Sequence, residues 1–504
     1  MSKVGLLQFD PTVGDLEQNV LRLSSLATQA KEAGATVGIS TELAVCGYPP
    51  RDLLMERDFV ERSMTAALNM SAPLPVLIGT PIPAEDDRTL PTNGVVRSGP
   101  DATSITNDEH GRIVAEKQLL PTYDVFDEAR YFAAKNRSGL ARSFGGFTLG
   151  VTVCEDAWQS AGMTPSSYAQ DPIEHIAEWT RQGVDIHATV NLSASPFHTE
   201  KFTTRLAVAR HAAAVLNHPF LLANQVGGND DLLFDGRSLV VWPDGRAVVA
   251  PSWQEGVLIV DLNDASACTW VGSHADDALS IGSATLMVLE PGDDGSTFVD
   301  TVEELTNAVV AGVADYCRKS SIGSIVLGLS GGIDSAVAAC VAAEALGPEN
   351  VTGLAMPSRH SSQHSIDDAL HTAQALGMHH HLHPIDAMHT SVETTLANVL
   401  ANGHPVAGEN LQARLRAILV MGYANANGSM AVTTGNKSEI AQGYCTLYGD
   451  MAGGYAPLGD VYKMEVYAMA ERFNQRASSL GKTEPVSAST MTKPPSAELA
   501  PDQT

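Results

Sequence analysis

A glycine-rich loop between a buried strand and a helix constrains this chain more than any other stretch. The loop reads GLSGGIDSA at residues 328–336 and follows the apolar run Ile325, Val326 and Leu327. Glycine permits left-handed turns that aim successive backbone N–H groups inward, and it lets an anion approach the main chain without a Cβ in the way. The N-terminus of the following helix adds the positive end of a dipole. The pattern therefore predicts a phosphate-binding loop.

The segments around this loop alternate between strands and helices. We expect strands at 324–329, 351–356 and 380–385, and helices at 336–347 and 365–377. Successive strand–helix–strand units build a parallel sheet with helices on both faces. The loop lacks the lysine of a GxxxxGK[ST] motif, and no GxGxxG follows the strand, so neither of those nucleotide motifs is present. For residues 330–335 taken by themselves, a helix-capping turn is the alternative interpretation.

The first half of the chain has a different rhythm. Short apolar runs begin at Val4, Val76, Phe147 and Ile186, and a helix with one apolar face follows Asp15. Glycine-containing turns, one in NDEHGR and one in WPDGRAVV, are typical of β-hairpins. We therefore expect antiparallel sheets covered by helices in this half.

A polar stretch divides the two halves. EPGDDGST at 290–297 has the glycine, proline and aspartate content of segments that separate domains. We therefore expect a first domain over 1–265, a linker over 266–297 and a second domain over 298–504.

Composition and charge exclude several classes of protein. The net charge of −27, spread without long runs of one sign, argues against binding of the nucleic-acid backbone. The N-terminus lacks the layout of a signal peptide, and no apolar run approaches the ~18 residues of a membrane span. A cytoplasmic protein without nucleic-acid or membrane partners is expected. The six cysteines form no CxxC pair, which predicts reduced thiols rather than disulfides or a zinc site.

Further segments follow the loop in a fixed order. They are MPSRHSS at 356–362, ENLQARLR at 409–416, TTGNKSEIAQGYCTLYGDMAGG at 433–454, PLGDVYK at 457–463 and KPPSAEL at 493–499. Together with SGGIDS they resemble the synthetase domain of the glutamine-dependent NAD synthetase family, from about residue 298 to the end. The resemblance implies an α/β domain of the ATP pyrophosphatase type, with a Rossmann-like parallel sheet similar to that of the adenine nucleotide alpha hydrolases.

This resemblance also implies roles for individual residues. The implied ATP-binding residues are Gly328, Leu329, Ser330, Gly331, Gly332, Ile333, Asp334, Ser335, Thr434 and Lys463. The implied deamido-NAD-binding residues are Asn410, Glu439 and Lys493. Asp334 and Glu439 match the family's magnesium ligands, and Mg²⁺ usually takes one or two protein carboxylates and completes its shell with phosphate and water. A single carboxylate at a strand end is otherwise more often a helix cap or a solvated side chain.

A cysteine ends another apolar strand, in GVTVCEDAW at 150–158. A single cysteine is more often an inert core residue, so Cys154 needs partners to be a nucleophile. Glu42, at the end of an apolar strand, and Lys117, just after a predicted hairpin, are candidates. A thiol that attacks an amide needs a carboxylate to take its proton and a cation to stabilise the oxyanion. The three residue types fit that chemistry.

Glu42, Lys117 and Cys154 occur in the chain order of the nitrilase-type amidases, and the match runs over about 4–262. That resemblance implies a nitrilase-like α-β-β-α sandwich that hydrolyses glutamine. Glu42 would be the base and acid, Lys117 the oxyanion stabiliser and Cys154 the nucleophile. The residues implied around glutamine are Tyr123, Glu128, Ser195 and Lys201, of which Glu128 matches an auxiliary acid.

The two resemblances imply one reaction. ATP would adenylate the nicotinic carboxylate of deamido-NAD and release diphosphate, and ammonia from glutamine would displace AMP to give NAD. Passing ammonia between the domains, away from bulk water, avoids its protonation. The alternative is a nitrilase-type amidase joined to a tRNA-modifying or inactive pyrophosphatase-like domain. Because the family's synthetase domains pair across a two-fold axis, we expect a homo-oligomer, a dimer or higher.

Three features need separate interpretation. The histidines at 379, 380, 381 and 383 could suggest a metal site, but alternate residues of a strand face opposite ways, so a third parallel strand is the better interpretation. His360 stands where the family usually has tyrosine. Relatives continue past the KPPSAEL segment, so we expect either an incomplete chain or an abbreviated lid over the nucleotide.

Overall fold

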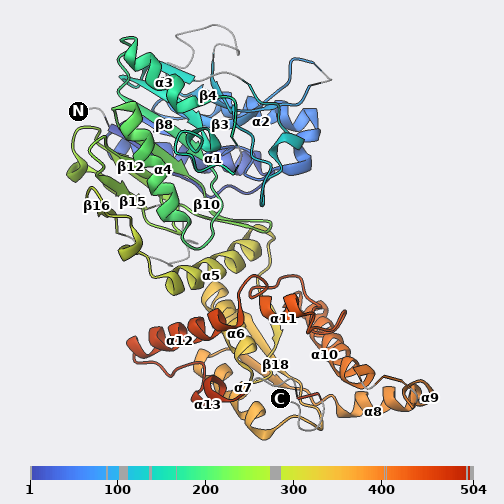
Figure 1. Cartoon of the computed structure of the whole chain (residues 1–504). Coiled ribbons are helices and arrows are strands. Elements are labelled where there is room, and N and C mark those ends of the chain that lie inside the picture. Colours follow the sequence, from blue (N-terminus) through green and yellow to red (C-terminus); the bar gives the residue numbers. More distant parts are fainter. Residues whose placement is uncertain are drawn as a thin grey trace. The chain divides into compact units, whose positions relative to one another are not determined.

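The computed structural model describes residues 3–86, 89–100, 112–135, 139–165, 167–272, 285–401, 403–404, 406–494 and 498–499. The chain divides into two compact units, Met1–Asp300 and Thr301–Thr504 (Figure 1). The finer division into a first domain, a linker and a second domain stays a prediction, because residues 273–284 of the expected linker lie outside the described residues.

The first unit contains two large sheets. Within the described residues, one seven-stranded sheet has the order β15-β14-β1-β2-β3-β4-β5, and the other has the order β16-β13-β12-β9-β8-β7-β6. The strands of the first sheet are β1 (Lys3–Gln8), β2 (Ala35–Ile39), β3 (Val76–Ile82), β4 (Thr92–Ser98), β5 (Ile113–Glu116), β14 (Gly256–Val260) and β15 (Thr269–Gly272). Those of the second are β6 (Gly139–Phe144), β7 (Phe147–Val153), β8 (Ala188–Ser193), β9 (Phe220–Asn224), β12 (Leu239–Val241), β13 (Ala247–Val249) and β16 (Met287–Leu289). A separate hairpin joins β10 (Val226–Asn229) to β11 (Leu232–Asp235).

Alternation along the strands gives each sheet two apolar faces. In β1, Val4 and Leu6 belong to the core that also contains Leu149 and other residues of the second sheet, whereas Leu7 belongs to the core under the helices. Helices α1 (Leu16–Glu32) and α2 (Arg57–Asn69) cover the outer face of the first sheet, and α3 (Pro172–Arg181) and α4 (Lys201–Leu216) that of the second. The predicted α-β-β-α sandwich is confirmed.

The expectation of antiparallel sheets is wrong for the middle of each sheet. Strands β1, β2 and β3 run parallel, as do β7, β8 and β9. Parallel neighbours need a crossover, which α1 provides between β1 and β2. The predicted hairpin from Trp242 is confirmed, because β12 and β13 pair antiparallel and Gly245 in the turn has φ +90°. The other predicted turn, at 107–112, lies outside the described residues except for Arg112.

The second unit has a parallel sheet in the order β19-β18-β17-β20, as predicted. Its strands are β17 (Ile325–Gly328), β18 (Val351–Ala355), β19 (His379–Leu382) and β20 (Met430–Val432). Helices α6 (Ile333–Leu346) and α10 (Val406–Asn427) lie on opposite sides of β18 (Figure 1). The remaining helices of this unit that the argument uses are α5 (Thr301–Lys319), α7 (Gln363–Leu376), α8 (Asp386–Thr395), α11 (Lys437–Gln442), α12 (Lys463–Ser479) and α13 (Ala488–Thr492).

Two smaller expectations concern strand β19 and membranes. His379, His380 and His381 lie in β19 and His383 directly follows it, which confirms the interpretation of this run as a third parallel strand. Among the residues that the structure describes, no helix combines the length and apolar character needed to cross a membrane.

A glycine lets two strands of the first sheet meet where Glu42 emerges. Glu42 follows β2 in a turn in which Leu43 has φ 46°. A Cβ at position 79 would lie 2.4 Å from the Thr41 carbonyl oxygen and 2.6 Å from the Leu43 nitrogen. Both are backbone atoms, which cannot rotate out of the way. Gly79 in β3 therefore allows the turn that carries Glu42 to pack directly against this strand.

We predict that Gly79→Ala lowers the free energy of unfolding of the first unit by about 1–3 kcal/mol, because the added methyl group forces the backbone to shift. Urea denaturation followed by tryptophan fluorescence measures this, since all five tryptophans lie in the first unit. Gly272→Ala is the matched control, because its Cβ would meet only an ordinary contact, 3.6 Å from the Trp270 ring nitrogen. Equal stability of the two variants would contradict the prediction.

Candidate active sites

Three strand ends of the first unit deliver the predicted triad to one buried region. Glu42 follows β2, Lys117 follows β5, and Cys154 opens the short 3₁₀ turn η4 (Cys154–Ala157) after β7. Glu42 and Lys117 are fully buried, and Cys154 is 5% exposed. The charges of Glu42 and Lys117 both act on the Cys154 thiol. The structure thus brings together the three residues that the sequence singled out.

Two carboxylates hold the Lys117 ammonium. Its Nζ donates to Glu42 Oε1 at 2.7 Å and to Glu128 Oε1 at 2.8 Å. Burial by itself would lower the pKa of Lys117, but the carboxylates of Glu128 and Glu42 outweigh burial and raise this pKa well above its ordinary value. Lys117 is therefore an ammonium at neutral pH, the form that can stabilise an oxyanion.

The Glu42 carboxylate is held from both sheets. Oε1 also accepts from Asn93 Nδ2 at 2.7 Å, and Oε2 accepts from the Ala194 N–H at 2.9 Å. Burial, followed by the Glu42 charge, raises the pKa of the Cys154 thiol well above its ordinary value, although Lys117 opposes this. Cys154 is therefore a neutral thiol that needs a base, and a carboxylate is the nearby candidate.

The residues predicted around glutamine surround the same region. Tyr123 OH donates to Glu155 Oε1 at 2.9 Å, and Lys201 Nζ lies 4.5 Å from the centre of the Trp158 ring. Burial, followed by the positive charge of Arg205, lowers the pKa of Lys201, while the carboxylates of Glu155 and Asp235 oppose this. The buried Ser195 follows Ala194 and its N–H donates to Asn224 Oδ1 at 2.9 Å. Tyr48 OH donates to Glu128 Oε1 at 2.9 Å.

Sequence reasoning missed several groups of this site. Three of these groups are hydrogen-bond partners: Tyr48 donates to Glu128, Asn93 donates to Glu42, and Asn224 accepts from the N–H of Ser195. Nothing in their local sequence pattern marks them. Glu155 had a signal, because an acid directly after a candidate nucleophile is unusual at a buried strand end. Tyr123 and Tyr168 both donate to it, the latter at 3.3 Å.

The glycine loop of the second unit forms the predicted turn between β17 and α6. Gly331 has φ +78°, and a Cβ there would lie 2.1 Å from the Ser365 carbonyl oxygen, so only glycine fits. The Ser335 hydroxyl accepts from the Ser330 N–H at 3.2 Å and donates to the Gly332 carbonyl at 2.9 Å. These bonds hold the loop around the N-terminus of α6, where an anion is favoured.

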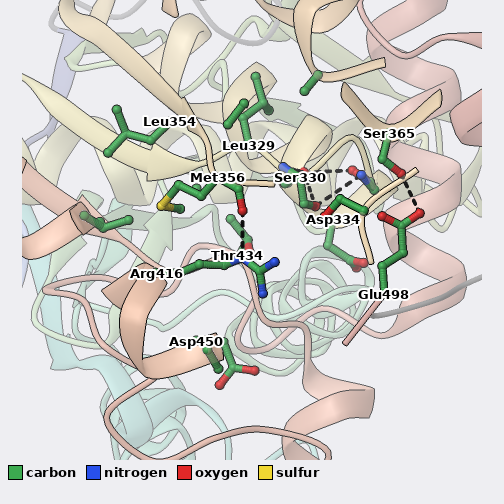
Figure 2. Close-up of a pocket in the computed structure, with 18 of the residues that line it drawn as sticks. Leu329, Ser330, Asp334, Leu354, Met356, Ser365, Arg416, Thr434, Asp450 and Glu498 are labelled. Carbon is green, nitrogen blue, oxygen red and sulfur yellow. Dashed lines mark hydrogen bonds between the residues drawn. The ribbon is translucent and has the colours of Figure 1, made fainter. Parts of the chain in front are cut away.

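A cavity of about 350 Å³ opens beside this loop (Figure 2). Its walls come from the loop, the end of β18, helices α7 and α10, the segment after β20 and the segment around Lys493. The predicted residues that line it are Gly328, Leu329, Ser330, Gly332, Asp334, Ser335, Thr434, Glu439 and Lys493. The predicted residues outside its lining are Gly331, Ile333, Asn410 and Lys463. His360 is not among the lining residues either.

Charged partners connect these residues. Asp334 Oδ1 accepts from Asn436 Nδ2 at 2.8 Å, while its Oδ2 forms an ion pair with Lys463 Nζ. Lys463 is thereby tied to the loop although it does not line the cavity. Burial, followed by the Asp334 charge, raises the pKa of Glu439.

The two other deamido-NAD candidates also have partners within the second unit. Asn410 Oδ1 accepts from the Thr446 hydroxyl at 2.8 Å. Lys493 Nζ lies 3.0 Å from Asp368 Oδ2, in a second ion pair.

Arg416 and Glu498 line the cavity without having been singled out from the sequence (Figure 2). Arg416 Nε donates to the Met356 carbonyl at 3.1 Å, and Glu498 accepts from the Ser362 and Ser365 hydroxyls at 2.8 and 2.9 Å. Both residues belong to segments that resemble the synthetase family, which was the available signal.

Comparisons with known proteins cover the whole chain. The carbon-nitrogen hydrolase family model matches residues 3–270, and the NAD synthase model matches residues 305–504. The glutamine-dependent NAD(+) synthetase of Synechocystis sp. is 39% identical over all of this chain and 85% of its own length. That of Rhodobacter capsulatus is 38% identical over all of this chain and 84% of its own length.

A solved structure agrees with these sequence comparisons. The glutamine-dependent NAD+ synthetase of Acinetobacter baumannii, in complex with ADP, superposes with a TM-score of 0.80 and 29% identity, covering 98% of this chain and 85% of that one. With both family domains in this order and this similarity along its full length, the chain belongs to the glutamine-dependent NAD(+) synthetases.

Proposed function

We propose that this chain makes NAD from deamido-NAD, with ATP as the source of free energy and L-glutamine as the nitrogen donor. ATP adenylates the nicotinic carboxylate and releases diphosphate; ammonia from glutamine then displaces AMP, and glutamate is the second product. One observation carries the proposal: a single chain holds both a buried Glu42–Lys117–Cys154 cluster and a phosphate-type loop that opens on a cavity.

The first unit would hydrolyse glutamine through a thioester. The Cys154 thiol attacks the amide carbonyl while Glu42 takes its proton, and the Lys117 ammonium stabilises the oxyanion. Glu42 then gives the proton to the leaving ammonia and activates the water that releases glutamate. Glu128 supports this by holding Lys117 in place, and Tyr48 in turn donates to Glu128. Tyr123, Ser195 and Lys201 are the proposed contacts to the rest of the glutamine molecule.

The second unit would bind ATP on the loop and deamido-NAD beside it. Loop N–H groups and Lys463 face the triphosphate, with Thr434 at the nucleotide and Asn410, Glu439 and Lys493 at the dinucleotide. Positioning and charge neutralisation supply most of the catalysis in phosphoryl and nucleotidyl transfer, because little covalent chemistry is left for the protein.

Asp334 and Glu439 fit the magnesium ion that this chemistry uses. The raised pKa of Glu439 partly reflects the neighbouring Asp334 carboxylate, and a divalent cation favours such a pair of oxygen donors. When bound there, Mg²⁺ would neutralise phosphate charge. Lys463, which pairs with Asp334 in this structure, is the proposed protein cation beside the phosphates.

We also propose that the chain forms a homo-oligomer in the cytoplasm, where ATP and glutamine are available. Large apolar side chains are exposed in the segment after β20, at Ile440 (45%), Leu447 (59%), Tyr448 (76%) and Met451 (45%). Exposed apolar groups gathered in one segment are typical of contact surfaces. A second copy of the chain is the proposed partner.

We predict that Cys154→Ala abolishes glutamine-driven NAD formation, by at least about 10³-fold, because the nucleophile is lost. Synthesis driven by ammonium salts should stay within about twofold of wild type, since the second unit is untouched. NAD formation with each nitrogen donor measures this. The matched control is Cys268→Ala, which removes another buried thiol of the same unit. Loss of both activities in Cys154→Ala would contradict two separable sites.

Lys463→Met should impair NAD synthesis and spare glutamine hydrolysis, the opposite of Cys154→Ala. Loss of the ammonium that faces the triphosphate should reduce NAD formation from either donor by roughly 10²-fold, while hydrolysis of glutamine to glutamate continues. Lys437→Met is the control, because Lys437 also begins a helix but pairs with the exposed Asp460. A Lys463→Met enzyme with normal synthesis would refute the assigned role.

Leu447→Glu should reduce self-association, because a charge would be buried at the proposed contact. Light scattering coupled to size-exclusion chromatography gives the mass, which we expect to be at least two chains for wild type and lower for the variant. Leu21→Glu, at a leucine on α1 that is 61% exposed, is the control and should leave the mass unchanged. A monomeric wild-type protein would show the proposal to be wrong.

A further inference from the structure

The glutaminase chemistry needs the Lys117 ammonium and the Cys154 thiol at a fixed separation, although the two come from different sheets. Lys117 follows β5 of the first sheet, and Cys154 follows β7 of the second. Strand hydrogen bonds act within each sheet, so they do not set the distance between these two strand ends. Another contact has to do so.

One buried carboxylate bridges the two strand ends. Asp156 lies two residues after Cys154 and is 1% exposed. Its Oδ1 accepts from the backbone N–H groups of Gln118 and Leu119, each at 3.0 Å, directly after Lys117. Its Oδ2 accepts from the N–H of Val153 at 3.1 Å, directly before Cys154. Each oxygen thus holds one of the two segments.

On the Cys154 side of this bridge, the backbone is strained. Cys154 has φ 42°, in the left-handed region that costs a residue with a Cβ about 1 kcal/mol or more. The bond between Asp156 and Val153 closes a turn around Cys154. It therefore opposes relaxation of the cysteine to an ordinary conformation, which would redirect the thiol.

The Lys117 side is fixed from two directions. The Lys117 N–H donates to the Asn93 carbonyl at 2.7 Å, and the Asn93 side chain in turn donates to Glu42. Asp156 holds the two residues that follow Lys117. Asn93 therefore ties Lys117 to Glu42 in the first sheet, while Asp156 ties it to Cys154 in the second.

A general requirement to satisfy buried N–H groups explains part of this arrangement, because such groups are nearly always hydrogen-bonded. It does not explain why one ionisable group serves both segments at the point where the two catalytic candidates emerge. Charge-assisted hydrogen bonds are about twice as strong as neutral ones, so the ionised form of Asp156 makes a stiffer bridge than an amide or a hydroxyl. Burial raises the pKa of Asp156 to about 7, while the N–H groups of Val153, Leu119 and Gln118 favour the carboxylate.

We propose that Asp156 is a positioning residue of the glutaminase reaction. It touches no substrate and takes no proton; it holds the ammonium and the thiol at the separation at which the thiol attacks and the ammonium meets the oxyanion. The proposal rests on the proposed function, and it adds a residue that acts through Lys117 and Cys154.

Asp156→Asn tests the proposal. Asparagine keeps one acceptor oxygen, so it cannot accept from both segments, and its NH₂ group would face a backbone N–H. Since misplacement by about 1 Å can cost about 10²-fold, we expect kcat for glutamine hydrolysis to fall about 100-fold. The KM for glutamine should change less than about threefold, because two of the proposed glutamine contacts, Ser195 and Lys201, lie on other segments, after β8 and at the start of α4. Ammonium-driven synthesis should stay within about twofold.

Two further variants complete the test. Asp171→Asn makes the same chemical change at a carboxylate that accepts from the Glu174 N–H at 3.1 Å as the cap of α3, and it should change nothing, since asparagine caps helices equally well. Asp156→Glu keeps the charge but is one methylene longer, so kcat should fall about tenfold at unchanged KM. Tryptophan fluorescence verifies folding of each variant.

A folded Asp156→Asn enzyme with normal kcat would overturn the proposal, and so would a raised KM at unchanged kcat. If Asp156→Asn does not fold, Asp156→Glu decides, because full kcat in that variant is incompatible with a positioning role. Cys154→Ala, measured in parallel, distinguishes failure of the proposed glutaminase site from failure of the role proposed for Asp156. Continued glutamine hydrolysis by Cys154→Ala would refute the glutaminase site itself. Loss of hydrolysis in Cys154→Ala, together with normal hydrolysis by Asp156→Asn, would refute only the role of Asp156.

Discussion

The first unit depends on one buried ammonium between two carboxylates. Removing one partner of a buried ion pair typically costs about 3–5 kcal/mol, so Lys117, Glu42 and Glu128 stabilise one another only as a complete set. Burial raises the pKa of Glu128 to about 7 against the opposing Lys117 ammonium, and neutral donors from Tyr48, Asn93 and Ala194 complete the hydrogen bonds of the two carboxyl groups. Because these donors come from both sheets, the site exists only when the sandwich is closed around it.

The second unit solves a different electrostatic problem, the binding of highly charged phosphates. Each lysine proposed to meet substrate already has a carboxylate partner, Lys463 with Asp334 and Lys493 with Asp368. A bound nucleotide would therefore replace the carboxylate partners of these lysines. Until it binds, the carboxylates neutralise the lysines, which lowers the free-energy cost of keeping cations near the cavity. The loop adds donors that carry no charge, from backbone N–H groups held by Ser330 and Ser335.

Both units place unusual backbone where chemistry is proposed. Cys154 has a positive φ, Gly331 fits only without a Cβ, and Gly79 lets the Glu42 turn approach β3. Such conformations persist when the surroundings over-determine them. In the first unit, Asp156 and Asn93 supply part of that support through backbone hydrogen bonds, and in the second unit Thr490 binds the Gly331 carbonyl at 3.3 Å.

The sequence by itself determined four strands and one helix of the first unit, the alternating strands and helices from β17 to β19, and the loop between β17 and α6, because short-range periodicity and glycine content report local backbone. Residue types and a family resemblance pointed to Glu42, Lys117 and Cys154 as the proposed triad. Only the tertiary structure decided that the central strands of the first unit run parallel, that Glu128 shares the Lys117 ammonium with Glu42, and that Asp156 joins two sheets. The physical reason is that these features depend on which distant segments pack together, and hydrogen bonds between such segments leave no periodic trace in the chain.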